Sequence, residues 1–175
     1  MQEQNKFLRF EQAILPHQDA AYNLARWLTR NDQDAEDVVQ EAYLRAFKFF
    51  DGFHGRDSRA WLLTIVRNTC YTWLQQNRAH GLTTSFDEEI HSANGNVFNP
   101  ERLLLQSTDN QLLRQALEEL PIEFREVLIL RELEGLSYKE IGDIAGIPVG
   151  TVMSRLARAR QRLQQSLSNL MSEGV

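Results

Sequence analysis

The residues best suited to binding a ligand lie between positions 137 and 162, where small and basic side chains share one face of a predicted helix. Ser137 and Glu140 have the S-x-x-E spacing of a helix capping box. Gly146 then supplies a turn, and Pro148 presets φ for a second helix. Two short helices joined in this way are typical of the helix-turn-helix motif, whose second helix enters the major groove of DNA.

The helix after Pro148 has two faces of different chemistry. Its apolar stripe must face a core and consists of Val149, Val152, Leu156, Ala159, Leu163 and Leu167. Its polar face suits base edges and phosphates and carries Thr151, Ser154, Arg158, Gln161 and Arg162, with Arg155 and Arg160 beside them. A solvated amphipathic helix is the alternative interpretation. However, no acidic residue lies between Ile147 and Asn169, although the net charge of the chain is −5. This local concentration of positive charge favours DNA binding, because counterion release scales with the phosphates neutralised.

The composition indicates a protein without export signal, disulfide or membrane span. The 175 residues, 42% of them apolar, suffice for one medium core or two small ones. The single cysteine, Cys70, lies among Val66, Trp73 and Leu74, so we expect a buried thiol and not a nucleophile. The N-terminus lacks a basic segment followed by an apolar stretch, and no apolar run approaches about twenty residues. We expect a cytoplasmic location.

The predicted fold is all-α, with two small helical domains joined by a flexible linker. Residues 1–80 have helical periodicity with short breaks and no competing strand pattern. Residues 81–108 are rich in Gly, Ser, Thr and Asn and have weak periodicity, which is typical of a linker. Residues 109–175 return to helical periodicity and contain the helix-turn-helix.

Acidic side chains begin a predicted helix that runs to about Phe50. They are Asp32, Asp34, Glu36, Asp37 and Glu41. Carboxylates at a helix start complement the positive end of the helix dipole. The face opposite the apolar arc exposes Asp37, Gln40, Glu41, Leu44 and Lys48. This face is either simply solvated or a docking surface for a basic protein. A metal site at Asp34, Asp37 and Glu41 is a weaker alternative, because no Glu-x-x-His pattern supplies a second ligand set. We therefore predict no metal and no cofactor.

A polar stripe also interrupts an otherwise apolar helix predicted from about Arg59 to Gln76. The stripe consists of Thr64, Arg67, Asn68, Tyr71, Gln75 and Arg78. Donors, an aromatic plane and positive charge together are suited to holding unpaired bases. The preceding loop carries Phe53 and His54 between glycines and suits an extruded base. The alternative is the wet side of a buried helix.

Four runs of the chain together form one family-like pattern. They are DAEDVVQEAYLRAF from Asp34, RAWLLTIVRNT from Arg59, LPIEFREVLILRELEGLSYKEI from Leu120 and PVGTVMSR from Pro148. In this order and spacing they resemble the extracytoplasmic-function (ECF) group of bacterial RNA polymerase sigma factors, in the sigma-70 family. The resemblance implies sigma region 2 over residues 1–80, a linker over 81–108 and region 4 over 109–175. It also implies a non-enzymatic factor that binds core RNA polymerase, recognises the minus-thirty-five and minus-ten promoter elements and promotes DNA opening.

The resemblance assigns expected roles to three sets of residues. Polymerase docking, on the β′ clamp helices, falls to Asp37, Gln40, Glu41 and Leu44, and region 4 is expected on the β flap. Contact with the minus-ten DNA falls to Phe49, Phe53, Arg67, Asn68 and Tyr71. Contact with the minus-thirty-five DNA falls to Thr151, Ser154, Arg155, Arg158 and Arg162. Met153 departs from the arginine often found there and offers only apolar contact. An anti-sigma factor is a further expected partner.

Two other classes of function remain as alternatives. A stand-alone helix-turn-helix regulator predicts a symmetric dimer on a palindrome but leaves the acidic helix without a role. An enzyme is less well supported. The histidines, at 17, 54, 80 and 91, lack metal-ligand spacing, and no nucleophile motif or glycine-rich phosphate loop occurs.

Overall fold

The computed structural model describes residues 2–55, 57–78 and 108–173, and the elements in these ranges are all helical. The first part, here called the N-terminal half, contains α1 (Gln2–Ile14), η1 (Leu15–His17), α2 (Gln18–Thr29), α3 (Asp32–Phe49), η2 (Phe50–Gly52) and α4 (Ser58–Arg78). The C-terminal half contains α7 (Thr108–Glu119), α8 (Ile122–Leu128), the π-helical segment η3 (Ile129–Leu133), α9 (Tyr138–Ala145) and α10 (Val149–Glu173). The predicted all-α class is confirmed. The predicted linker, apart from Thr108, lies outside the described residues.

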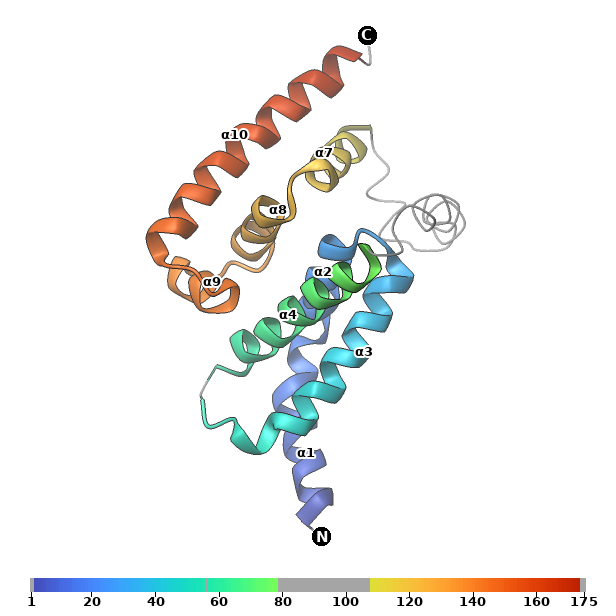
Figure 1. The fold of residues 1–175 in the computed structure, drawn as a ribbon, viewed down its shortest axis with the longest axis vertical. Coiled ribbons are helices and arrows are strands. Elements are labelled where there is room, and N and C mark those ends of the chain that lie inside the picture. Colours follow the sequence, from blue (N-terminus) through green and yellow to red (C-terminus); the bar gives the residue numbers. More distant parts are fainter. Residues whose placement is uncertain (1, 56, 79–107, 174–175) are drawn as a thin grey trace.

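Helices α2, α3 and α4 form the body of the N-terminal half (Figure 1). Helix α2 ends at Thr29, and the next residue, Arg30, adopts a left-handed φ of 63°. The side chain of Asn31 then caps α3 by accepting from the backbone N–H of Asp34 at 3.0 Å. These two residues produce the sharp reversal that sets α3 against α2. The acidic first turn of α3 follows directly from this cap.

In the C-terminal half, a tight turn joins α9 to α10 as the sequence predicts. The capping box is confirmed, with Ser137 Oγ accepting from Glu140 N at 3.1 Å and Ser137 N donating to the Glu140 carboxylate at 3.0 Å. Gly146 has a φ of 70°, and Ile147 N donates to Gly142 O at 3.0 Å. A Cβ on Gly142 would lie 2.7 Å from the backbone carbonyl oxygen of Ile147. The turn therefore depends on a glycine at 142.

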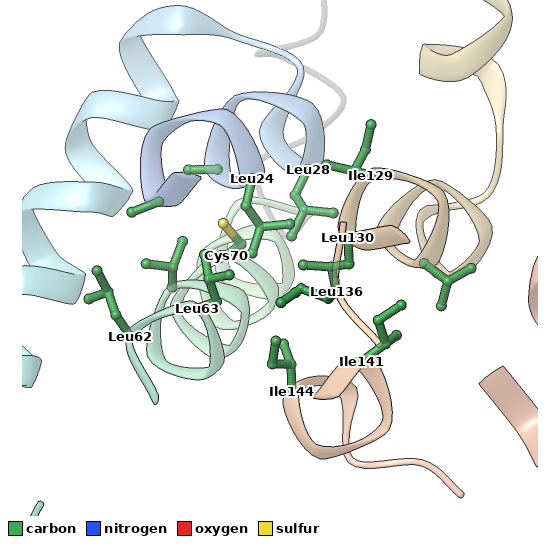
Figure 2. Close-up of a cluster of buried hydrophobic side chains, with 14 of the residues drawn as sticks. Leu24, Leu28, Leu62, Leu63, Cys70, Ile129, Leu130, Leu136, Ile141 and Ile144 are labelled. Atoms are coloured by element: carbon green, nitrogen blue, oxygen red, sulfur yellow. The ribbon is translucent and has the colours of Figure 1, made fainter. Parts of the chain in front are cut away.

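The two halves share one continuous hydrophobic core. Leu24, Leu28 and Leu63 of the N-terminal half point into the same region as Ile129, Leu130, Leu136 and Ile144 of the C-terminal half (Figure 2). The contacts run from α2 to α8 and from α4 to α9, whereas α3 lies on the side away from α9 and α10 (Figure 1). We call this packing of the two halves the closed arrangement. No helix in the described ranges is long and apolar enough to cross a membrane.

Candidate nucleic-acid interface

Helix α10 presents the basic face that the sequence predicts. Its stripe of Val152, Leu156 and Ala159 is buried against the rest of the C-terminal half, whereas Val149, predicted to belong to that stripe, is 43% exposed. Val149 is the first residue of α10, so it has no preceding helical turn to pack beside it. The exposed side chains are Ser154, Arg158 and Arg162, with Thr151 and Arg155 partly exposed. Helix α9 and its turn hold this face outward.

The arginines of α10 differ in their contacts. The guanidinium of Arg160 donates to the Glu132 carboxylate at 2.9 Å, and Arg162 lies over the ring of Phe124 at 5.4 Å from its centroid. Met153 is 53% exposed on the same helix. These contacts leave Arg158 as the strongest candidate for reading a base edge, because it is exposed and its neighbours at 154 and 162 face the same way.

On α3, the residues expected to dock on polymerase all lie at the surface. Asp37, Gln40 and Glu41 are exposed, and Leu44 is 73% exposed, the highest value among the large apolar side chains of the described residues. Glu41 pairs with Arg45 at 3.0 Å across one helical turn, an arrangement that stabilises an exposed helix by only about 0.5 kcal/mol. Asp34, Asp37 and Glu41 share this helix, and the described residues hold no group of three side chains arranged to bind a metal.

The aromatic residues expected at the minus-ten element lie at the end of α3 and in the following loop. Phe49 is 59% exposed, and Lys48 Nζ lies 5.6 Å from its ring centroid. Phe53 stacks at 4.7 Å on Trp61 of α4 and lies 6.3 Å from Phe50. Phe50 also meets Trp61 edge to face at 6.2 Å, so these three rings support the loop and hold Phe53 partly exposed beside α4.

Two side chains of the polar stripe on α4, those of Arg67 and Tyr71, share a partner that the sequence analysis did not identify. Glu126 of α8 is fully buried, and its carboxylate accepts from Arg67 Nε at 2.5 Å and from Tyr71 Oη at 2.6 Å. The Arg67 guanidinium lies 3.8 Å from the Tyr71 ring centroid and also donates to Asn68 Oδ1 at 3.2 Å. We call Arg67, Tyr71 and Glu126 the Glu126 cluster. It joins the two halves through α4 and α8.

Burial and charge shift the pKa values in the Glu126 cluster. Burial, followed by the charge and hydrogen bond of Glu126, raises the pKa of Tyr71 well above its ordinary value. Burial by itself lowers the pKa of Arg67, but the hydrogen bond and charge of Glu126 outweigh it and raise the pKa. The Tyr71 phenol thus stays protonated and the Arg67 guanidinium stays charged at neutral pH. One sequence signal could have found Glu126, because this acidic residue falls between Ile122 and Leu130 on an apolar helix face.

A second buried charge, on Arg125, also spans the two halves. Its guanidinium donates to Glu118 O at 3.0 Å and to Leu120 O at 2.8 Å, near the C-terminus of α7, and to Leu28 O of α2 at 3.3 Å. Cations favour the carbonyl ends of helices. Burial, and then the charge of Arg30, lower the pKa of Arg125 to about 10. Arg125 therefore stays charged at neutral pH while it bridges α7 and α2.

Comparisons with known proteins agree with the two helical regions. Family models described as Sigma-70 region 2 and Sigma-70 region 4 match residues 13–80 and 110–163. The ECF RNA polymerase sigma-E factor of Escherichia coli strain K12 is 36% identical over 145 residues, covering 79% of this chain and 76% of the relative. The RNA polymerase sigma-H factor of Pseudomonas aeruginosa is 32% identical and covers 94% of this chain and 89% of the relative. The fold and the two regions define a sigma factor of the sigma-70 family.

Within that family, this chain belongs to the ECF RNA polymerase sigma factors. The ECF sigma factor SigE of Mycolicibacterium smegmatis is 34% identical over 94% of this chain, which spans 63% of that relative's length. Among solved structures, the sigma factor RpoE in complex with the anti-sigma factor NepR from Bartonella quintana matches with a TM-score of 0.74 and 34% identity, covering 91% of this chain and 97% of that one. CnrH in complex with the cytosolic domain of CnrY matches with a TM-score of 0.65 and 26% identity, covering 91% and 88%.

Proposed function

We propose that this chain binds core RNA polymerase in the cytoplasm and directs it to promoters by reading the minus-thirty-five element with α10 and the minus-ten element with α3, α4 and their connecting loop. One observation carries the proposal. The two family regions expose faces of opposite charge, basic on α10 and acidic on α3. The basic face fits DNA, and the acidic face fits a basic protein surface.

Reading of the minus-thirty-five element would use the major groove. Ser154, Arg158 and Arg162 project from one face of α10, with Thr151 near its start. Arginine can donate two hydrogen bonds to one guanine, and a serine hydroxyl contacts several bases or a phosphate. Met153 offers a thymine methyl an apolar contact. A few side chains of α10 would therefore select the DNA sequence, whereas the total positive charge of the helix would supply most of the affinity for DNA.

Capture of the minus-ten strand would use Phe49, Phe53, Arg67, Asn68 and Tyr71. Partly exposed rings at the end of α3 can stack on an unpaired base, and the amide of Asn68 can donate to and accept from its edge. Holding an extruded base shifts the melting equilibrium toward the open duplex, because the closed duplex cannot make these contacts. The chain would thereby promote opening without performing chemistry, and polymerase would supply the catalysis.

The docking face of α3 would bind the clamp helices of the polymerase β′ subunit, and region 4 would bind the β flap. This face consists of Asp37, Gln40, Glu41 and Leu44. Leu44 would supply an apolar anchor inside a charged rim, as is common in protein interfaces. One solved relative is a complex of a sigma factor with an anti-sigma factor, and in another CnrH is bound to the cytosolic domain of CnrY. We infer that an anti-sigma factor also regulates this chain.

Run-off transcription tests the proposed function. The purified chain is added to sigma-free core polymerase with a library of promoter fragments, and the transcripts are sequenced. The proposal expects discrete start sites that share two upstream elements and that depend on the added chain. A symmetric dimer bound to a palindrome without transcription would instead identify a stand-alone regulator.

A further inference from the structure

We propose that Arg67 and Tyr71 form an anion site that Glu126 occupies in the closed arrangement and that a backbone phosphate of the minus-ten strand occupies once the two halves separate. Glu126 thereby acts as an internal competitor of promoter DNA. The inference rests on the proposed function, since it concerns the same face of α4, and it assigns to Glu126 a role in controlling access to that face.

The geometry of the Glu126 cluster matches what a phosphate requires. Arg67 and Tyr71 lie one helical turn apart on α4, and their donors reach the two oxygens of one carboxylate at 2.5 and 2.6 Å. A phosphodiester also presents two unbridged oxygens that carry one negative charge. A guanidinium and a hydroxyl are frequent phosphate ligands. The same two donors can therefore accept either anion.

The closed arrangement excludes DNA from this site. Glu126 is fully buried, and the Arg67 side chain is only 19% exposed. The cover is α8, which shares the continuous core with α2 and α4. A strand of DNA could reach Arg67 Nε and Tyr71 Oη only after α8 moves away from α4. Occupation by Glu126 and occupation by DNA are therefore mutually exclusive.

The energetics favour an exchange of anions over a permanent contact. A buried ion pair gains little net stability, because desolvation of both charges offsets much of their attraction. Separation of the halves exposes the guanidinium and the phenol to water, and a phosphate then offers both donors a charged acceptor again. Glu126 meanwhile regains water. The net cost of the exchange is consequently smaller than the cost of losing the carboxylate alone.

The docking face, in contrast, is open in the closed arrangement. Asp37, Glu41 and Leu44 are all exposed on α3, which lies on the side of the N-terminal half away from α9 and α10 (Figure 1). The closed molecule can thus reach polymerase before it can hold a strand. This order would keep the free protein from binding single strands elsewhere and would couple their capture to polymerase.

The test compares single-strand binding by the full chain and two variants. Glu126→Gln keeps the shape of the side chain but removes its charge, and Glu123→Gln is the matched control, with the same charge change on an exposed position of α8. Fluorescence anisotropy measures the affinity for a labelled, mixed-sequence single-stranded oligonucleotide, because phosphate contacts do not depend on base sequence. Small-angle scattering measures the radius of gyration. We expect Glu126→Gln to bind about tenfold more tightly than wild type and to be larger, and Glu123→Gln to match wild type within about twofold.

Arg67→Ala in the Glu126→Gln background should abolish the gain. Equal affinities of wild type and Glu126→Gln would overturn the proposal, and so would a gain that persists without Arg67. If Glu126→Gln fails to melt cooperatively, Glu126→Asp replaces it. The shorter side chain keeps the charge but cannot reach both donors, so a smaller gain in the same direction is expected.

Run-off transcription by the wild-type chain separates the two proposals. Absence of transcripts together with the tenfold gain would refute the proposed function and leave the anion site supported. Normal transcripts with equal affinities would refute competition by Glu126 alone.

Discussion

Individual arginines of α10 carry different parts of the proposed DNA contact, because their positions on the helix differ. Arg160 is paired with Glu132 at 2.9 Å, and Arg162 lies over Phe124. Arg158 is exposed between Ser154 and Arg162 on the outer face. A base contact and a phosphate contact have different signatures, so one variant can distinguish them.

Arg158→Ala is expected to weaken binding to a matched promoter by about 1 to 3 kcal/mol, since a bidentate contact to a guanine would be lost. Binding to a scrambled fragment should change far less. The measurement is DNA affinity, in the presence of core polymerase, on both fragments at two salt concentrations. Arg160→Ala is the control and should change both affinities little. A uniform loss on both fragments, with the salt slope lowered by about 0.9, would place Arg158 on a phosphate instead.

At the scale of single residues, the sequence predicted contacts between residues close together in the chain and did not predict the contact between Arg67 and Glu126, which lie far apart in it. The S-x-x-E spacing of Ser137 and Glu140 predicts their capping box, because the two partners are three positions apart and the motif depends on local backbone geometry. Glu126 meets Arg67 across 59 positions. No local periodicity specifies such a pairing, and an acid on an apolar helix face was its only trace.

The helices depend on two features of the turn between α9 and α10, a left-handed Gly146 and a close approach at Gly142. Gly142→Ala is expected to lower the free energy of unfolding by about 1 to 3 kcal/mol, because its Cβ would lie 2.7 Å from the Ile147 carbonyl and the backbone must shift. Gly150→Ala is the matched control. Its Cβ would meet no atom within 4 Å, and alanine favours a helix by up to about 1 kcal/mol. Urea unfolding followed by circular dichroism measures both. Equal midpoints for the two variants would show that the turn tolerates a side chain.

Helix α3 is expected to dock through its charge and its exposed leucine. Glu41→Lys should weaken association with core polymerase by about tenfold or more, because it sets a cation against a basic surface. Its fold should be unchanged, since the 49% exposed Glu41 side chain pairs only with Arg45 within its own helix. Gel filtration with core polymerase and thermal melting provide the two readouts. Glu3→Lys, with the same charge change in the first turn of α1, is the control. Normal association of Glu41→Lys would remove α3 from the docking role.

At the scale of elements, periodicity and caps located the helices well. The acidic helix, predicted to run to about Phe50, ends at Phe49, and the helix predicted from about Arg59 to Gln76 spans Ser58–Arg78. The π-helical segment Ile129–Leu133 was not predicted, because it requires one residue more per turn and no side-chain pattern announces it. It ends three positions before Leu136, which is fully buried in the shared core. A local irregularity of this kind is set by tertiary packing.

At the scale of the whole molecule, the prediction of two helical domains is confirmed, but the sequence did not predict how the two pack together. The described residues of both halves bury their apolar faces in one core. Amphipathic patterns state that a helix has an apolar face but do not state which other face covers it. The closed arrangement therefore could not be predicted from the sequence patterns and is seen only in the three-dimensional structure.

That arrangement predicts a loss of stability at alkaline pH. Cys70 and Tyr71 are neighbours on α4, and burial, then the charge of Glu126, raises both pKa values, that of Cys70 from 9.0 to about 12. Above pH 9 the unfolded chain therefore releases the thiol proton while the folded chain keeps it. The free energy of unfolding must then fall as pH rises between about 9 and 12, by at most about 1.4 kcal/mol per pH unit for each such group, and must be unaffected by these groups below that range.

Cys70→Ala isolates the contribution of the thiol. Urea midpoints of wild type and variant are compared at about pH 8 and about pH 10.5, two values that bracket the ordinary pKa of a thiol. The variant loses stability at both values because a buried group has been removed, and this constant difference cancels when each protein is compared with itself. We expect wild type to lose more stability than Cys70→Ala between the two pH values. Parallel losses would mean that the thiol of the folded chain titrates as freely as in the unfolded chain, and that the shared core admits water at Cys70.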